Sequence, residues 1–282
     1  MKKILLPTDF SETSVNAIRY AFNLFNDTEA EMHLVHAFDV APSTLGVTRE
    51  EKLKTHFYEV TEAQAKEEMK KLLDRIKTEF PERKGKIRAF TTPNDLMDAV
   101  PNAIKELQAD LVLMGTKGAT GAQEVFLGSN AVKVMKRLKN IPLLLVPGKA
   151  TYTELKHIVF FNDLRRHFEK EEVQPMVDLA KLGNAEISLV YLKHVNELTP
   201  EQEKNKEELK HLLKEMETRE LVMALEDEVN QVITDFTAKE NVNLLAMIRN
   251  KHGFFEKIFR EPVISKVAFH TEVPFLVIPE IP

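Results

Sequence analysis

The chain has 282 residues, of which 43% are hydrophobic, and a formal net charge of −5 at pH 7. This length and apolar content suffice for two domains, each with its own core. The acidic balance argues against a nucleic-acid binder, which usually has a basic surplus. The sequence contains no cysteine, which excludes disulfides, thiolate metal sites and a cysteine nucleophile and fits a reducing compartment.

Neither a secretory signal nor a membrane span is indicated. The opening residues MKKILLPTDF contain too few apolar side chains for the core of a signal peptide, and no apolar run approaches the length of a membrane helix. We therefore expect a soluble, cytoplasmic protein.

Strand and helix signals alternate along the first half of the chain. Short apolar runs predict strands, and apolar residues spaced three and four apart predict helices. Ser11 and Asn94 are the expected N-caps of two of these helices. Strands are expected at 3–6, 31–38, 86–92, 110–115 and 142–146, with helices at 11–25, 49–81, 94–107 and 128–138 between them. This alternation predicts a parallel sheet with helices on both faces and ligands at the carboxyl ends of the strands.

The second half repeats the pattern, so the chain contains an internal duplication. KKILLPTD at 2–9 matches KHIVFFND at 156–163, and NIPLLLVP at 140–147 matches EVPFLVIP at 272–279. GKATYT at 148–153 is the natural linker. The sequence thus predicts an α/β protein with two tandem, doubly wound, five-stranded parallel-sheet domains, at 1–148 and 154–282. In the second domain, helices are expected up to 182 and at 200–217, 227–239 and 254–270.

A glycine-rich loop between a strand and a helix is the main functional signal. It contains Gly115, Gly118 and Gly128, and Ser129 follows the last glycine. Glycine lets a backbone approach a ligand closely, and a helix N-terminus offers unpaired N–H groups and a partial positive charge, as a phosphate cradle requires. Ordinary turn chemistry also explains glycines in such a loop. Neither a Walker pattern nor a GxGxxG fingerprint is present.

Three motifs in this order resemble the universal stress protein family: PTDFSETS at 7–14, LVHAFD at 34–39 and MGxxGx9GS at 114–129. Because the match recurs in both halves, the chain resembles a tandem, UspA-like protein. The resemblance implies a Rossmann-like fold of the adenine nucleotide alpha hydrolase type.

The resemblance also implies an ATP site in the first copy. The residues implied are Pro7, Thr8, Asp9 and Ala37 near the base and Met114, Gly115, Gly118, Gly128, Ser129 and Asn130 around ribose and phosphates. Lys117 would add a flexible positive charge, and Mg²⁺ would be bound through the phosphates and water. The alternative role of Asp9 is that of a loop carboxylate, and the alternative role of Ser129 is that of an N-cap.

The second copy departs from the family pattern at these positions. By sequence alignment of the two copies, Ala37 corresponds to Tyr191, while Gly115, Gly118 and Gly128 correspond to Met247, Asn250 and Arg260. Large side chains would fill the cradle, so we expect the second copy to be nucleotide-free. Phe254, Phe255 and Phe259 in this region indicate core packing or, alternatively, a surface for a partner.

No catalytic constellation is recognisable. His33 and His36 fall on opposite faces of a predicted strand and are interpreted as structural. The leading hypothesis is an ATP-binding regulatory protein of the stress response with an unidentified protein partner. The alternatives are a nucleotide-independent scaffold and an ATPase that is slow at most. Family members commonly dimerise through their last strand, so the two copies are expected to pair through PLLLVP and PFLVIP as an intramolecular pseudo-dimer, with a homodimer of whole chains as a further option.

Overall fold

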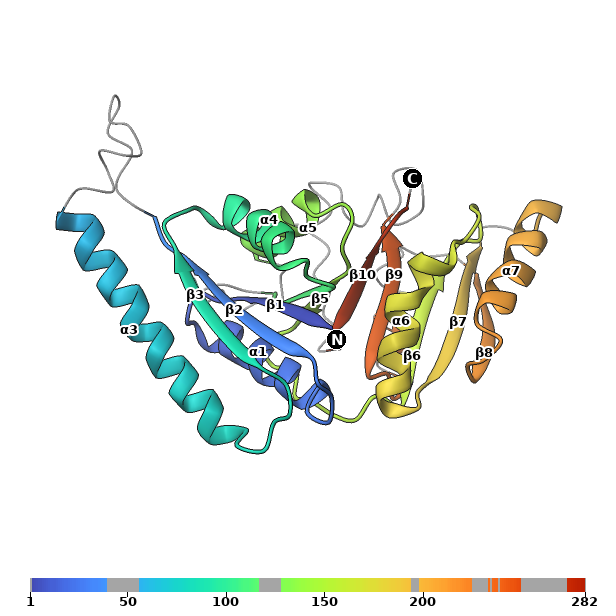
Figure 1. Ribbon diagram of the computed structural model, residues 1–282. Helices are drawn as coiled ribbons and strands as arrows, with labels where there is room; N and C mark the ends of the chain where they lie inside the picture. Colours follow the sequence, from blue (N-terminus) through green and yellow to red (C-terminus); the bar gives the residue numbers. More distant parts are fainter. Residues whose placement is uncertain are drawn as a thin grey trace, which may run out of the picture.

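One ten-stranded sheet runs through the protein, with helices on both faces (Figure 1). The structure is a computed structural model that describes residues 2–39, 56–116, 128–193, 198–224, 233, 235–237, 239–249 and 273–281. Among these residues, no helix is both long enough and apolar enough to cross a bilayer.

The first half of the sheet has the strand order β3-β2-β1-β4-β5, and all its neighbouring strands are parallel. Its elements are β1 (Lys3–Pro7), α1 (Glu12–Leu24), β2 (Glu31–Ala37), α3 (His56–Glu79), β3 (Ile87–Thr92), α4 (Leu96–Leu107), β4 (Leu111–Gly115), α5 (Ser129–Arg137) and β5 (Leu143–Val146).

The second half has the equivalent order, β8-β7-β6-β9-β10, and is also parallel throughout. Its elements are β6 (His157–Asn162), α6 (Lys170–Gly183), β7 (Glu186–Lys193), α7 (Pro200–Leu212), β8 (Thr218–Ala224), β9 (Leu244–Arg249) and β10 (Phe275–Pro279). The α/β fold with two doubly wound five-stranded units, expected from the alternating pattern, is confirmed.

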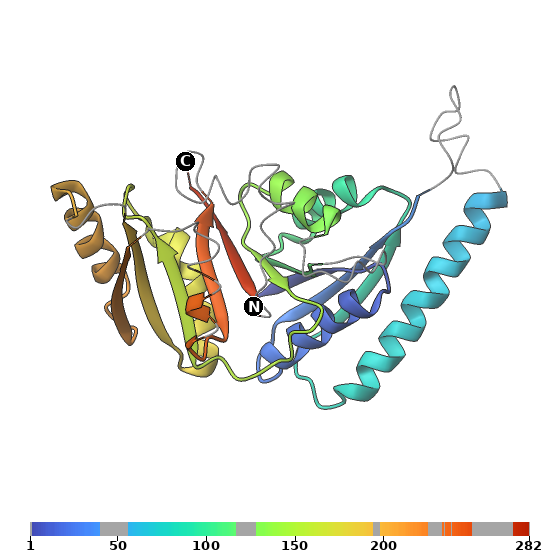
Figure 2. The same ribbon diagram turned by 180° about the vertical axis from the view of Figure 1, so that it is seen from behind.

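The two halves meet where β5 and β10 pair in antiparallel fashion, with Leu144 opposite Leu276 (Figure 2). Each of these strands would otherwise be an exposed edge of its own half. The two strands that end in proline thus join the copies within one chain. The linker runs beside α1, where the Asn16 side chain donates to the Ala150 carbonyl at 2.8 Å.

Matching hydrogen bonds in the two halves fix which residues correspond. Asp110 N donates to Lys3 O at 2.9 Å, and Asn243 N donates to His157 O at the same distance. This register pairs Gly115 with Ile248, so the expected partner Met247 is wrong by one residue.

The second strand of each half needs the same correction. Lys3 lies opposite Glu31 and His157 lies opposite Glu186, so Ala37 corresponds to Leu192 and the expected partner, Tyr191, is wrong. Tyr191 corresponds instead to His36.

The helix caps follow the sequence in one case and not in the other. Ser11 caps α1 by accepting a hydrogen bond from Ser14 N, as predicted. For α4 the N-cap is Asp95 rather than Asn94, because the Asp95 carboxylate accepts from both Met97 N and Asp98 N, at 2.7 and 3.0 Å. Two orphan amides at the start of the helix are thereby satisfied.

Helices divide between the two faces of the sheet. The apolar residues of α1, α3, α6 and α7 pack with one face, and those of α4 and α5 pack with the other. Several sequence predictions lie outside the described residues, among them the first residues of the 49–81 helix, the 254–270 helix, and the positions Lys117, Gly118, Asn250, Arg260, Phe254, Phe255 and Phe259.

Candidate functional site

A pocket opens at the carboxyl ends of β1, β2 and β4. Strand order reverses between β1 and β4, because the chain builds outward from β1 to β3 and then returns to the other side of β1. Ligands of open α/β sheets bind at such a reversal. The cavity volume is about 110 Å³, and the lining residues are Pro7, Thr8, Asp9, Ser14, Ala37, Leu96, Met114, Gly115, Asn130 and Ala131.

Seven of the ten residues predicted for the site line this pocket. Gly128 and Ser129 are described but do not line it, and Gly118 lies outside the described residues. Three lining residues, Ser14, Leu96 and Ala131, were not predicted. Each belongs to a helix that faces the strand ends, and a helical position alone carries no sequence signal for a binding role.

A directed chain of hydrogen bonds holds the turn between β1 and α1. Phe10 N donates to Thr8 Oγ1 at 3.0 Å, and Ser14 Oγ donates to Ser11 O at 2.9 Å. The Thr8 and Ser14 hydroxyls lie 3.0 Å apart, so the Thr8 hydroxyl must donate to Ser14. Both hydroxyl hydrogens are therefore used within the turn, and the two buried hydroxyls offer only acceptor lone pairs to the pocket.

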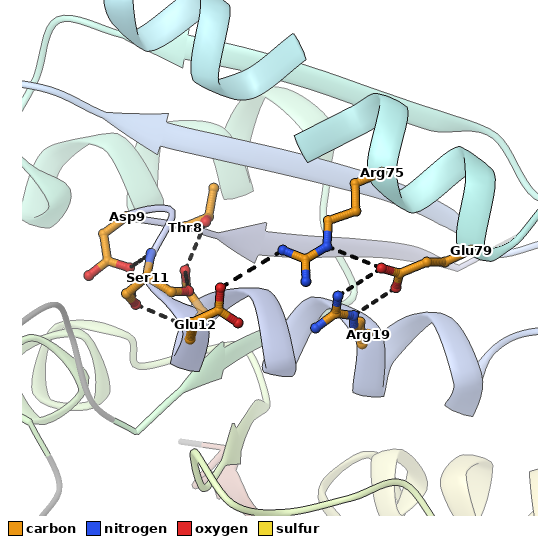
Figure 3. A network of polar contacts seen from close by, with 8 residues as sticks. Thr8, Asp9, Ser11, Glu12, Arg19, Arg75 and Glu79 are labelled. Carbon is orange, nitrogen blue, oxygen red and sulfur yellow. Dashed lines mark hydrogen bonds and ion pairs between the residues drawn. The ribbon is translucent and has the colours of Figure 1, made fainter. Parts of the chain in front are cut away.

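Asp9 stabilises the same turn from its exposed side. Its Oδ1 accepts from Ser11 N at 3.1 Å and from Ser11 Oγ at 2.5 Å (Figure 3). Phe10, the next residue, has a φ of 62° in the left-handed region, which this local bonding helps to hold. The turn role that was the alternative for Asp9 is thus observed, and its side chain is exposed at the edge of the pocket.

An ion-pair network fixes the first turns of α1 against α3 (Figure 3). Arg19 binds Glu79 through two hydrogen bonds of 2.7 Å, and Arg75 contacts both Glu79, at 3.2 Å, and Glu12, at 3.9 Å. The hydrogen bonds from Arg19 hold the pKa of the Glu79 carboxyl below its usual value. Paired two-point contacts of this kind restrict geometry more than single ion pairs do.

The two histidines of β2 lie on opposite faces of the sheet, and His36 supports the turn that borders the pocket. His36 Nδ1 donates to the Thr8 carbonyl at 2.8 Å, and its ring lies 4.3 Å from the ring of Phe10. His33 is on the opposite face, buried beside Glu31. Both histidines therefore have structural contacts, and Ala37, between the two strand ends, presents only a methyl group to the pocket.

Gly115 lies at the end of β4 directly against α1. A Cβ at this position would lie 2.9 Å from the carbonyl oxygen and from the Cγ2 of Thr13. A backbone atom cannot yield as a flexible side chain can, so the close approach of strand and helix already requires a glycine here. The requirement from packing is independent of any ligand.

Helix α5 points its amino-terminal end at the pocket through Asn130 and Ala131. Its N-cap is Gly128, which makes no side-chain capping bond, so the N-cap role considered for Ser129 is wrong. Gly128 N donates to Thr116 O at 2.5 Å. The first amides of α5 have no partner within the helix and carry a partial positive charge, which favours an anion.

In the second half, larger side chains stand at the corresponding positions. Leu192 replaces Ala37 and Ile248 replaces Gly115, and each is 4% exposed. The two side chains point to opposite faces of the sheet: Leu192 packs in the same apolar cluster as Val35 and Val112, whereas Ile248 packs in the cluster on the α6 face. At these two positions, the small residues that line the pocket are thus present only in the first half.

The described residues contain no group of three or more His, Cys, Asp or Glu side chains that could hold a metal ion. Asp9 is the only carboxylate among the lining residues that the structure describes. The described lining residues therefore offer acceptors on the β1 side and helix amides on the α5 side, and they contain no second ionisable side chain besides Asp9.

Comparison with known proteins identifies a family that the first half of the chain matches. Residues 1–147 match the Universal stress protein family. A universal stress protein of Methanocaldococcus jannaschii is 33% identical over 150 residues, covering 51% of this chain and 81% of the relative. A second one from the same organism is 28% identical over 156 residues, covering 52% and 96%.

One solved structure, a universal stress protein from Archaeoglobus fulgidus, resembles the entire chain. It covers 99% of this chain and 96% of its own, with a TM-score of 0.67 and 15% identity, and so shares the fold across both halves. The chain therefore belongs to the universal stress protein family, as a tandem of two copies.

Proposed function

We propose that this protein is a nucleotide-binding regulator of the stress response that holds ATP in the pocket of its first half only. The observation that carries the proposal is the pocket at the strand-order reversal, lined by seven of the residues that family resemblance assigns to the nucleotide.

The distribution of donors and acceptors supports an orientation for the nucleotide. Thr8, Ser14 and Asp9 present acceptors, which suit the amino group of the base and the ribose hydroxyls. The amides at the start of α5 suit the phosphates. A cavity of about 110 Å³ is smaller than the usual ligand site of roughly 300–1,000 Å³, so the described residues supply only part of the site.

Mg²⁺ would enter with the phosphates. It prefers oxygen ligands, keeps several waters and needs one or two carboxylates at most, a demand that Asp9 and the phosphates meet. Asp9 is the only ionised side chain among the described lining residues, and no general base can be named there, so we propose binding and signalling rather than turnover as the function.

Binding is tested by equilibrium dialysis of the purified chain against ATP with Mg²⁺, together with the nucleotide content of the protein as isolated. We expect one ATP per chain. Gly118→Trp should abolish it by filling the predicted loop. Two ATP per chain would contradict the restriction to the first half, and absence of binding would favour the nucleotide-independent scaffold. Release of phosphate above the background of the buffer would favour a slow ATPase.

A further inference from the structure

Helix α5 contacts both the pocket and the second half of the molecule. Asn130 and Ala131, in its first turn, line the pocket. Met135 in its last turn and Leu138 just beyond line a small cavity at the junction of the halves, whose other walls include Arg249 of β9 and Val277 of β10. A helix of nine residues is about 13 Å long, so any axial shift at one end is passed to the other.

Arg249 reaches from the second half to the carboxyl end of this helix. Its Nη1 donates to the carbonyl oxygen of Met135, which lies among the last four residues of α5 and has no partner within the helix. A cation is favourable there because the carboxyl end of a helix carries partial negative charge. Burial lowers the pKa of Arg249, partly opposed by Glu280, but an arginine stays charged at neutral pH.

At the amino end of α5, the described anchor is the backbone hydrogen bond from Gly128 N to Thr116 O. Its N-cap glycine makes no side-chain capping bond, and its first turn contains no acidic residue. Val134 and Met135 are buried against the sheet, which fixes the face that the helix presents. Arg249 therefore adds a side-chain contact that holds the carboxyl end of α5, in addition to the backbone bond at its amino end.

The residue of the first half that is equivalent to Arg249 lies next to the pocket. By the strand register Arg249 corresponds to Thr116, the residue that follows Gly115 and opens the glycine loop of the first half. In the second half this position carries a long cation that crosses β10 to the other copy. The second half thereby contributes a side chain to the support of the pocket in the first.

We propose that Arg249 is a positioning residue, through which the second half holds α5 and sets the place of its amino-terminal amides in the ATP pocket. The coupling rests on the proposed function, whereas the anchoring of α5 does not. The ligand affected is the phosphate portion of the nucleotide, since α5 faces that portion.

Two measurements on the full chain test the two parts separately. Hydrogen exchange of the α5 amides measures how firmly Arg249 anchors the helix. Dialysis with ATP and Mg²⁺ measures whether this anchoring affects ATP affinity. Arg249→Met keeps an apolar stem and removes the guanidinium, and Arg249→Lys restores the charge. Arg219→Met is the matched control, because Arg219 binds Glu186 and Glu240 in the second half and makes no described contact with α5.

We expect Arg249→Met to speed α5 exchange about tenfold and to weaken ATP binding by about three- to tenfold. Arg249→Lys should recover part of both, and Arg219→Met should change neither. Unchanged α5 exchange in Arg249→Met would overturn the anchor. Faster exchange with unchanged ATP affinity would overturn the coupling alone. If the unsubstituted chain bound no ATP, the proposed function and the coupling would both fall, while the exchange data would still decide the anchor.

Discussion

The carboxyl ends of β1 and β6 show the same turn in two different surroundings. Asp9 Oδ1 accepts from Ser11 N at 3.1 Å, and Asp163 Oδ1 accepts from Arg165 N at 3.2 Å. In both turns the residue after the aspartate is left-handed, with φ of 62° at Phe10 and 56° at Leu164. The aspartate therefore stabilises the same backbone turn in both copies, and its presence alone does not identify a nucleotide site.

The surroundings distinguish the two turns. Asp9 is exposed beside an open pocket, whereas Asp163 is only 7% exposed. Side chains of α7 cover the second turn, where Gln202 donates to Asp163 O and Asn205 donates to Leu164 O, each at 2.9 Å. Because the turns are alike and their neighbours differ, we expect the residues around the strand ends, rather than the aspartate, to decide whether a nucleotide binds, and the following predictions test that difference.

Removing the buried carboxylate of Glu172 should have the largest effect on stability. Its side chain is fully buried and accepts from Arg166 Nη2 at 2.6 Å, from Ile281 N at 2.9 Å and from Glu169 N at 3.1 Å. Glu172→Ala would leave the mostly buried Arg166 with only the longer contact to Glu280, at 3.9 Å, so we expect a loss of about 3–5 kcal/mol in the free energy of unfolding, measured by urea denaturation.

Two further variants sharpen this result. Ser14→Ala, at the equivalent turn of the first half, removes hydroxyl bonds only and should cost about 1 kcal/mol. Adding Arg166→Met to Glu172→Ala should recover much of the stability, because no unpaired charge remains. A Glu172→Ala protein as stable as Ser14→Ala would show that the second turn is not held by this charge pair.

Much of the fold was predictable, because the spacing of apolar residues and the positions of turn residues depend on local structure. Strand positions follow from that pattern, whereas the pairing of the two proline-terminated strands was expected from the family resemblance. The correspondence of the copies was wrong by one residue at Gly115 and Ala37, because insertions in the connecting loops shift the alignment and only hydrogen bonds across strands reveal the shift. Asn94 and Asp95 are both good caps, and which one bonds depends on backbone geometry.

The site was predictable in part. Family motifs mark strand ends, so they identified Asp9, Ala37 and Gly115, whereas Ser14 and Leu96 reach the pocket only through helix packing. Arg249 was not predicted, because its contact with Met135 joins residues far apart in the sequence and on different copies.

Among exchanges of residues between the two copies, the one at the end of β2 should have the largest effect on ligand binding. Ala37→Leu introduces the residue that the second half carries as Leu192 and fills the pocket with a branched side chain. An overpacked site loses about 1–3 kcal/mol, so ATP affinity should fall about 10- to 100-fold in dialysis. Leu192→Ala should leave one ATP per chain, and undiminished binding by Ala37→Leu would remove Ala37 from the site.

Adding a methyl group at the end of β4 should separate packing from binding. In Gly115→Ala the new Cβ meets the backbone of Thr13, so we expect a loss of about 1–3 kcal/mol in the free energy of unfolding. In the second half Ile248 at this position packs in the apolar cluster that includes α6, and seven residues, 163–169, precede α6, compared with four, 8–11, before α1. Reduced ATP affinity with unchanged stability would instead assign Gly115 to the ligand.

The smallest expected effect is a difference in pH dependence between the buried positions of β2 and β7. His33 is 2% exposed with its Nε2 3.2 Å from Glu31 Oε2, and burial lowers its pKa, an effect that Glu31 only partly offsets. The equivalent residue of the second half, Ser188, cannot titrate; its hydroxyl lies 2.8 Å from His157 Nε2.

Because the unfolded chain protonates His33 near pH 6.5 and the folded chain only at lower pH, the unfolded state binds more protons between these values. The stabilisation is therefore complete above about pH 6.5 and is lost as the pH falls toward the lowered folded pKa. Between pH 7.5 and 5.5 the loss from this group should be about 1 kcal/mol at most. His33→Gln should flatten urea-denaturation stability over this range by that amount, since the remaining histidines are common to both proteins. An identical pH profile in the variant would mean that His33 titrates alike in the folded and unfolded chains, and the buried positions of the two copies would then respond to acid in the same way.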